Sequence, residues 1–285
     1  MACGRFVSDT AFASLHRCIR SSVQAAMTAQ LLSERVDTTL VLTISNPEAR
    51  NALHPDIYAA SQEALELASR DDEIRAVVIT GADGVFCAGG NLNRLLGNRA
   101  KPREVQAESI EVLNHWIETL HAFPKPIIAA VEGPAAGAGF SLVLACDFVV
   151  AASDAKFVMA YVNVGLTPDG GGSYELARNL PRQLASELIM EGKPVDAARL
   201  AHFGLVNRVV PPGQALTEAL RLGESLATRS PHAMGRIKAL INHAATASLT
   251  EHLAEERDNF VAALHHKDGG EGIGAFLEKR KPNYR

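Results

Sequence analysis

Cysteine is scarce in this sequence, and no two cysteines have the C-x-x-C spacing. The four that occur, Cys3, Cys18, Cys87 and Cys146, are too scattered to indicate a disulfide framework. The sequence also lacks an H-E-x-x-H motif and any Cys/His cluster, so we expect no metal site. These absences favour free thiols in a reducing compartment.

The chain also lacks an excess of charge of one sign and any long apolar run. Its net charge is −4 and its Lys and Arg residues are dispersed, so it has no electrostatic footprint for a nucleic acid. No apolar stretch approaches the ~18 residues that a membrane helix needs. No G-K-[ST] sequence occurs, which excludes a Walker-type phosphate loop. We therefore expect a cytoplasmic protein with no nucleic-acid or membrane partner.

The first thirty residues differ in composition from the rest of the chain. They contain three arginines and several serines but a single acid, Asp9. This composition fits an organellar transit peptide or an over-extended start, with Met27 as the true initiator. We favour the second because a secretory h-region is absent. In either case we expect residues 1–30 to lie outside the fold.

Two glycine-rich turns, within residues 76–92 and 127–142, are the most informative features that the chain does contain. Each follows an apolar run that predicts a buried strand, Ala76–Thr80 and Ile127–Val131, and each precedes a helix. The first N–H groups of a helix are unpaired donors in a favourable dipole, and small residues leave them uncovered. Two such turns brought together could hold one developing oxyanion between their backbone N–H groups.

Alternating and helical periodicities predict the elements around these turns. A strand is expected at 38–44, a helix begins at Pro55, and a second helix covers 105–120. Further strands are expected at 148–151, 157–159 and 205–210. Two later helix starts are predicted, one by Ser230 before Pro231 and one by a capping box of Ser248 with Glu251. Periodicity alone therefore predicts an α/β protein with a helical end.

Four motifs, in this order, resemble those of the enoyl-CoA hydratase/isomerase (crotonase) superfamily. They are N-P-E-A-R-N-A-L at 46–53, F-C-A-G-G-N-L at 86–92, G-P-A-A-G-A-G-F-S-L at 133–142 and F-L-E-K-R-K-P at 276–282. The match covers roughly Leu31 to the C-terminus and is specific for the family, though not for one reaction. The resemblance implies a crotonase-like spiral of ββα units over 31–210 and a helical trimerisation region over 211–285. It also implies an acyl-CoA substrate, no cofactor beyond the CoA moiety, and a trimer or a dimer of trimers.

By position, Gly90 and Ala138 match the family's two oxyanion donors, acting through their backbone N–H groups. A thioester carbonyl gains charge on oxygen as it becomes an enolate, and preorganised donors stabilise that charge. The alternative is that both turns serve only close strand–helix packing. Their pairing in family order favours the oxyanion role.

The two glutamates of the family's hydratases are absent. Ser141 and Tyr161 stand in their places, and neither hydroxyl is a competent base near neutral pH. One acid remains nearby, Asp169 in G-L-T-P-D-G-G-G-S at 165–173. Members with an aspartate here include isomerases, in which it shuttles a proton, and residues 165–182 resemble ring-isomerising and ring-opening members from aromatic-acid (phenylacetate-type) degradation. Asp169 could instead be a turn residue or a helix N-cap.

The resemblance also implies a set of CoA-binding residues. The N-A-L segment and the first loop surround adenine, and two cations near the C-terminus serve a neighbouring subunit's ligand. These residues are Arg50, Ala52, Ala88, Asn91, Leu92, Lys279 and Arg280.

Three functions remain open from the sequence. The first is an isomerase or ring-opening enzyme in which Asp169 transfers the proton. The second is an enoyl-CoA hydratase with this single carboxylate and a water held by Ser141 or Tyr161. The third is a non-catalytic acyl-CoA-binding subunit.

Overall fold

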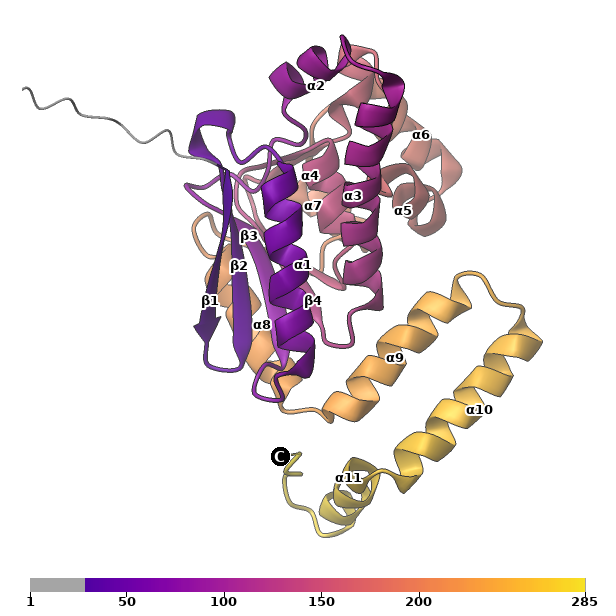
Figure 1. Cartoon of the computed structure of the whole chain (residues 1–285). Coiled ribbons are helices and arrows are strands. Elements are labelled where there is room, and N and C mark those ends of the chain that lie inside the picture. The colour runs from indigo at the N-terminus through magenta and orange to yellow at the C-terminus, as the bar shows by residue number, and fades with distance from the viewer. Residues whose placement is uncertain (1–28, 285) are drawn as a thin grey trace, which may run out of the picture.

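In the computed structural model, which describes residues 29–284, two β-sheets are surrounded by helices (Figure 1). The larger sheet has six strands in the order β1-β2-β3-β4-β6-β9, and the smaller has three in the order β5-β7-β8. The strands are β1 Gln30–Val36, β2 Thr39–Ser45, β3 Ala76–Gly81, β4 Ile127–Val131, β5 Pro134–Ala136, β6 Phe148–Ala152, β7 Lys156–Val158, β8 Val195–Asp196 and β9 Arg208–Val210. Only β1 runs antiparallel within the larger sheet, so the carboxyl ends of its other strands meet at one edge.

Helices cover both faces of the larger sheet, as expected for parallel strands. They are α1 Pro55–Arg70, α2 Leu92–Asn98, α3 Arg103–Ala122, α4 Ala138–Leu144, α5 Gly172–Asn179, α6 Arg182–Glu191, α7 Ala197–His202, α8 Ala215–Ala227, α9 Pro231–Ala244, α10 Leu249–His265 and α11 Lys267–Leu277. Two 3₁₀ turns lie at Pro47–Ala49 and Ala160–Val164.

The core is divided between the two faces of the sheet because successive strand residues point to opposite sides. Val77 and Ile79 of β3 belong to the main core with α1 and α3, whereas Val78 packs with α8 on the other face. All three side chains are fully buried. β3 and β4 therefore form a rigid centre from which both glycine-rich turns leave at the same edge.

Most of the elements expected from the sequence are present. β4 has the predicted bounds, α1 begins at Pro55, and both predicted caps, at Ser230 and Ser248, are formed. The prediction missed β1, whose side chains are mostly exposed and whose apolar residues do not alternate, and it made β9 too long. An edge strand of this kind is specified by its partner β2 rather than by its own pattern.

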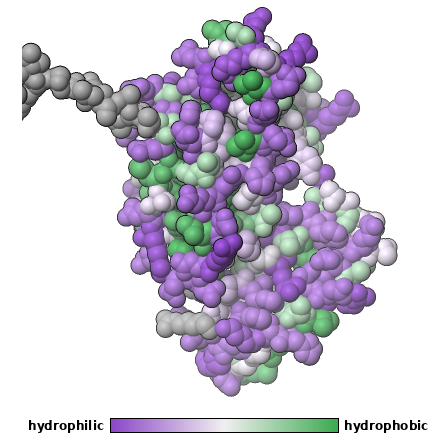
Figure 2. Space-filling model, viewed as in Figure 1, coloured by the Kyte–Doolittle hydropathy of each residue, from purple (hydrophilic) through white to green (hydrophobic). Residues whose placement is uncertain are grey.

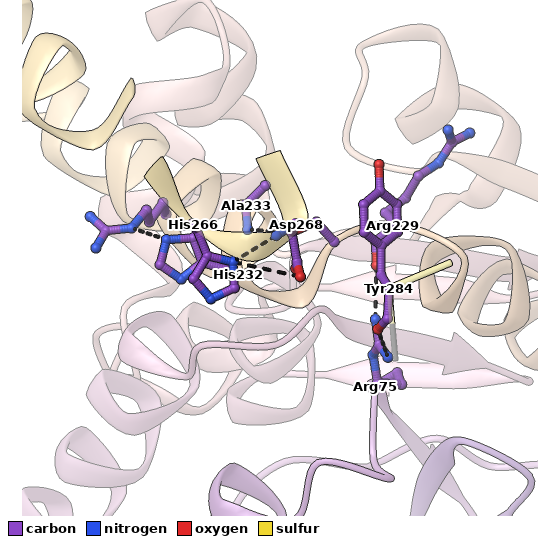
Figure 3. Close-up of polar contacts among 9 residues, drawn as sticks. Arg75, Arg229, His232, Ala233, His266, Asp268 and Tyr284 are labelled. Carbon is purple, nitrogen blue, oxygen red and sulfur yellow. Dashed lines mark hydrogen bonds and ion pairs between the residues drawn. The ribbon is translucent and has the colours of Figure 1, made fainter. Parts of the chain in front are cut away.

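The last three helices extend away from the sheets and return toward them at the C-terminus (Figure 1). Figure 3 shows contacts that attach these helices to each other and to the sheet region. The rings of His232 and His266 stack with centroids 3.8 Å apart. The guanidinium of Arg75 donates to the carbonyl of Arg229 at 2.8 Å and to that of Tyr284 at 3.4 Å. The division of the chain after residue 210 stays a prediction. α8, which follows that point, packs against β3, β4 and β6.

No helix within residues 29–284 is both long and apolar enough to cross a membrane. The same residues contain no group of three or more His, Cys, Asp or Glu side chains arranged to hold a metal ion. The residues predicted to form an N-terminal extension lie almost entirely outside the described part of the chain.

Candidate active site

The two glycine-rich turns lie side by side and are joined by backbone hydrogen bonds. The N–H of Phe86 donates to the carbonyl of Glu132 at 2.9 Å, and that of Cys87 to Pro134 at 3.1 Å. In return, the N–H of Ala136 donates to the carbonyl of Cys87 at 2.9 Å. These bonds continue the strand pairing beyond β3 and β4 and fix the two turns relative to each other.

Glycine is required where the turns touch. A Cβ on Gly89, whose φ is +90°, would lie 2.6 Å from the carbonyl oxygen of Ala136 and 3.4 Å from the nitrogen of Ala138. A Cβ on Gly139 would lie 2.5 Å from the carbonyl oxygen of Cys87. Since side chains at these positions would push the turns apart, the glycines permit the approach that brings residues 90 and 138 together.

The N–H groups of Gly90 and Ala138 donate to no acceptor within residues 29–284. Gly90 is exposed just before α2, and Ala138 is the first residue of α4, where the helix leaves its N–H unpaired. Gly137, the residue before α4, has a φ of +51°, a backbone conformation that favours glycine. Two neighbouring free donors are the chemical requirement for binding a developing oxyanion.

Asp169 is held against the same helix start by two hydroxyl groups. The phenol of Tyr161 donates to its carboxylate Oδ1 at 2.6 Å, and the hydroxyl of Ser141, in the first turns of α4, donates to its backbone carbonyl at 2.9 Å. A Cβ on Gly137 would lie 3.7 Å from the ring of Tyr161. The Asp169 carboxylate is therefore linked, through the Tyr161 ring, to the residue that precedes Ala138.

The carboxyl group of Asp169 is partly withdrawn from water. Burial raises the pKa of its carboxyl group above the ordinary value, while the hydrogen bond from Tyr161 opposes that shift. Burial and the nearby Asp169 charge raise the pKa of Tyr161, so its phenol stays protonated and donates. The alternative helix-cap role does not apply, because α5 is preceded by Gly171 and has no side-chain cap.

Cys87 lies inside the first turn and is not available for chemistry. It is fully buried, its Sγ accepts a hydrogen bond from the N–H of Gly89 at 3.4 Å, and burial raises its pKa to about 12. A thiol in that state is protonated at neutral pH and is a packing group.

The residues expected to bind CoA fall into two groups. Arg50 and Ala88 are adjacent, because the Ala88 N–H donates to the Arg50 carbonyl at 3.1 Å, and Leu92 is exposed close by at the start of α2. Ala52 is buried, and the side-chain oxygen of Asn91 caps α2 by accepting from the Arg94 N–H at 3.1 Å.

The second group, Lys279 and Arg280, lies just beyond α11, at the opposite end of the molecule from α2 (Figure 1). The guanidinium of Arg280 contacts the carboxylates of Glu271 and Glu278 at 2.6 and 2.7 Å. One chain alone therefore does not bring these two cations to the site.

Two further side chains beside the site were not found from the sequence. Tyr58 of α1 packs on Trp116 of α3, with ring centroids 5.4 Å apart, and Arg94 of α2 donates to the hydroxyl of Ser109 in α3 at 3.1 Å. Burial raises the pKa of Tyr58, and the charges of Arg94 and Asp169 act on it in opposite directions. No motif marks either residue, because only packing of α1, α2 and α3 brings them here.

Comparisons with known proteins show the family to which this chain belongs. The sequence profile described as enoyl-CoA hydratase/isomerase matches residues 34–285. The chain belongs to the enoyl-CoA hydratase/isomerase family. It is 38% identical to the 1,2-epoxyphenylacetyl-CoA isomerase of Escherichia coli (strain K12), over 89% of this chain and 97% of that protein. It is 35% identical to the 2,3-dehydroadipyl-CoA hydratase of the same organism, over 90% and 99%.

Solved structures of this family share the fold. The crystal structure of an enoyl-CoA hydratase from Polaromonas sp. JS666 has a TM-score of 0.89 and 60% identity, over 90% of this chain and 100% of that one. These comparisons confirm the crotonase-like fold and an enzyme of the enoyl-CoA hydratase/isomerase family acting on acyl-CoA.

Proposed function

We propose that this enzyme isomerises or ring-opens an unsaturated acyl-CoA, with Asp169 as the group that transfers the proton. The observation that carries the proposal is the 2.6 Å contact between the Tyr161 phenol and the Asp169 carboxylate beside the free N–H of Ala138. The similarity to the 1,2-epoxyphenylacetyl-CoA isomerase supports the same class of reaction.

The thioester carbonyl oxygen would bind between the N–H groups of Gly90 and Ala138. Asp169 in its ionised form would then take a proton from a carbon next to the conjugated system, and the electron pair would move onto the thioester oxygen. The two N–H donors would stabilise the resulting enolate. Return of the proton from Asp169 to a different carbon completes a double-bond shift without net gain or loss of atoms.

Among the described residues, the site lacks the second carboxylate that a two-acid hydration mechanism would use. Ser141 is fully buried and its hydroxyl is already donated to the Asp169 carbonyl, so it is a positioning residue. The Tyr161 proton is donated to the carboxylate itself. A single carboxylate suits moving one proton between two carbons, whereas hydration also requires a water to be activated and a proton delivered.

The experiment is Asp169→Asn, tested on a panel of enoyl-CoA thioesters with separate identification of hydrated, double-bond-shifted and ring-opened products. Because Asn keeps the size and removes the base, turnover should fall by at least ~10² while acyl-CoA affinity changes little. Asp154→Asn, at an exposed position after β6, is the matched control. A folded Asp169→Asn enzyme with undiminished turnover would refute the assignment, and a hydrated product from the unmodified enzyme would favour the hydratase alternative.

We propose that the CoA adenine binds at Arg50, Ala52, Ala88, Asn91 and Leu92, and that Lys279 and Arg280 act on a neighbouring subunit's ligand. This arrangement needs a neighbouring subunit, which the trimer or dimer of trimers implied by the family resemblance would supply. The helices α9 to α11 support it, because they expose apolar side chains including Ile241, Leu249, Phe260 and Phe276, and Figure 2 shows hydrophobic residues interrupting their polar surface. Sedimentation should give three or six subunits at micromolar concentration, and a monomer would contradict the proposal.

A further inference from the structure

Arg94 is a half-buried cation without a carboxylate partner in the described part of the chain. Its Nη1 donates to the neutral hydroxyl of Ser109, and its Nε is buried with no acceptor. The more deeply buried cation Lys238, by contrast, meets the carboxylate of Asp147 at 2.8 Å. Because a charge withdrawn from water needs a counter-charge, an anionic group of a bound ligand would supply what this cation lacks.

The contact with Ser109 places the Arg94 guanidinium on the part of α3 that leads to the Asp169 loop. Ser109 lies four residues, about one turn, before Leu113 on the same face of α3, a rise of about 6 Å. Leu113 packs against the Asp169 turn, since a Cβ on Gly170 would lie 3.4 Å from its Cδ2. Arg94 is therefore roughly one helical turn along α3 from the Asp169 loop.

Two other contacts agree with this placement. Tyr58 packs on Trp116, two turns beyond Ser109 on that face of α3, and the pKa of its phenol responds to the charges of both Arg94 and Asp169. On α2, Leu95 follows Arg94 directly, and its Cδ1 lies 3.7 Å from where a Cβ on Gly90 would stand. The backbone of α2 that carries Arg94 therefore lies close to the backbone of Gly90.

We propose that Arg94 binds a carboxylate at the far end of the acyl group, so that the substrate is the monothioester of a dicarboxylic acid. The proposal rests on the proposed function only for the position of the thioester between Gly90 and Ala138. A guanidinium matches a carboxylate because its N–H groups form two parallel, charge-assisted hydrogen bonds. An acyl chain with its reacting carbons at Asp169 and its other end extended along α3 would reach Ser109 and Arg94.

The test measures binding rather than turnover, so it does not depend on the reaction catalysed. Isothermal titration calorimetry compares hexanoyl-CoA with adipoyl-CoA, which has the same six-carbon chain but ends in a carboxylate. Both are saturated and do not react. The proteins are the unmodified enzyme, Arg94→Leu, Arg94→Lys and Arg99→Leu, the last an exposed arginine at the end of the same helix.

The unmodified enzyme should bind adipoyl-CoA more tightly than hexanoyl-CoA. Arg94→Leu should lower the ratio of the two affinities about 10- to 100-fold, the value of charged hydrogen bonds to one carboxylate. Arg94→Lys should restore part of the ratio, and Arg99→Leu should leave it unchanged.

An equal loss of affinity for both thioesters in Arg94→Leu would overturn the proposal, because the anion bound would then be a phosphate of CoA or the defect would be structural. An unchanged ratio would overturn it as well. Either result would leave the Asp169 mechanism standing, whereas failure of the Asp169→Asn experiment would leave the affinity ratio unaffected.

Discussion

The hydrogen bond between Tyr161 and Asp169 makes a quantitative prediction for Tyr161→Phe. The substitution keeps the ring against Gly137 and removes only the hydroxyl that donates to Asp169 Oδ1 at 2.6 Å. Burial raises the pKa of Asp169 and this bond opposes the rise, so removing it raises the pKa further. A hydrogen bond to a charged group contributes about 1.5–3 kcal/mol, which corresponds to about a 10- to 100-fold smaller ionised fraction on the acid side.

The assay is the pH profile of kcat/KM. The base acts as a carboxylate, so activity rises with pH through the raised pKa of Asp169, and that acid limb should move to higher pH in Tyr161→Phe. On the limb, kcat/KM should fall about 10- to 100-fold, and the deficit should shrink as the pH rises. Tyr174→Phe is the control, because Tyr174 is exposed and its ring contacts Arg178 instead. An acid limb that stays in place, or an equal loss at every pH, would refute the reasoning.

Two further predictions concern the oxyanion donors and the attachment of the C-terminal helices. Ala138→Pro removes a donor N–H at the first position of α4, where proline is tolerated, so turnover should fall on the order of 10²–10³. Circular dichroism checks folding, and a folded variant with full turnover would show the oxyanion site to be elsewhere. Lys238→Met leaves the Asp147 carboxylate and the Leu120 carbonyl without the ammonium that each meets at 2.8 Å, and should lower the free energy of unfolding by about 3 kcal/mol. Lys193→Met, at an exposed ion pair, should change it little in the same denaturant titration, and similar losses in the two variants would refute the account.

The sequence by itself determined the features that depend on short-range interactions. β4 is a run of five buried residues, and the caps at Ser230 and Ser248 are bonds to backbone groups three residues away. Such features are encoded by neighbouring residues and can be predicted with few assumptions. The two glycine-rich turns were equally visible, and their pairing was inferred from the resemblance to a family whose members share it.

Only the tertiary structure decided how the site is assembled. The spacing of Tyr161 and Asp169 in the sequence does not predict that they touch. Their side chains meet against α4 only because a 3₁₀ turn and a glycine-rich loop lead the chain back between them. Ser141 occupies a glutamate position in the motif, yet its burial makes it a support for the Asp169 backbone. Arg94 and Tyr58 carry no motif, because their place depends on how α2 and α1 pack against α3. Contacts of this kind depend on the path of the whole chain, since residues far apart in sequence meet only after the sheets and helices have packed.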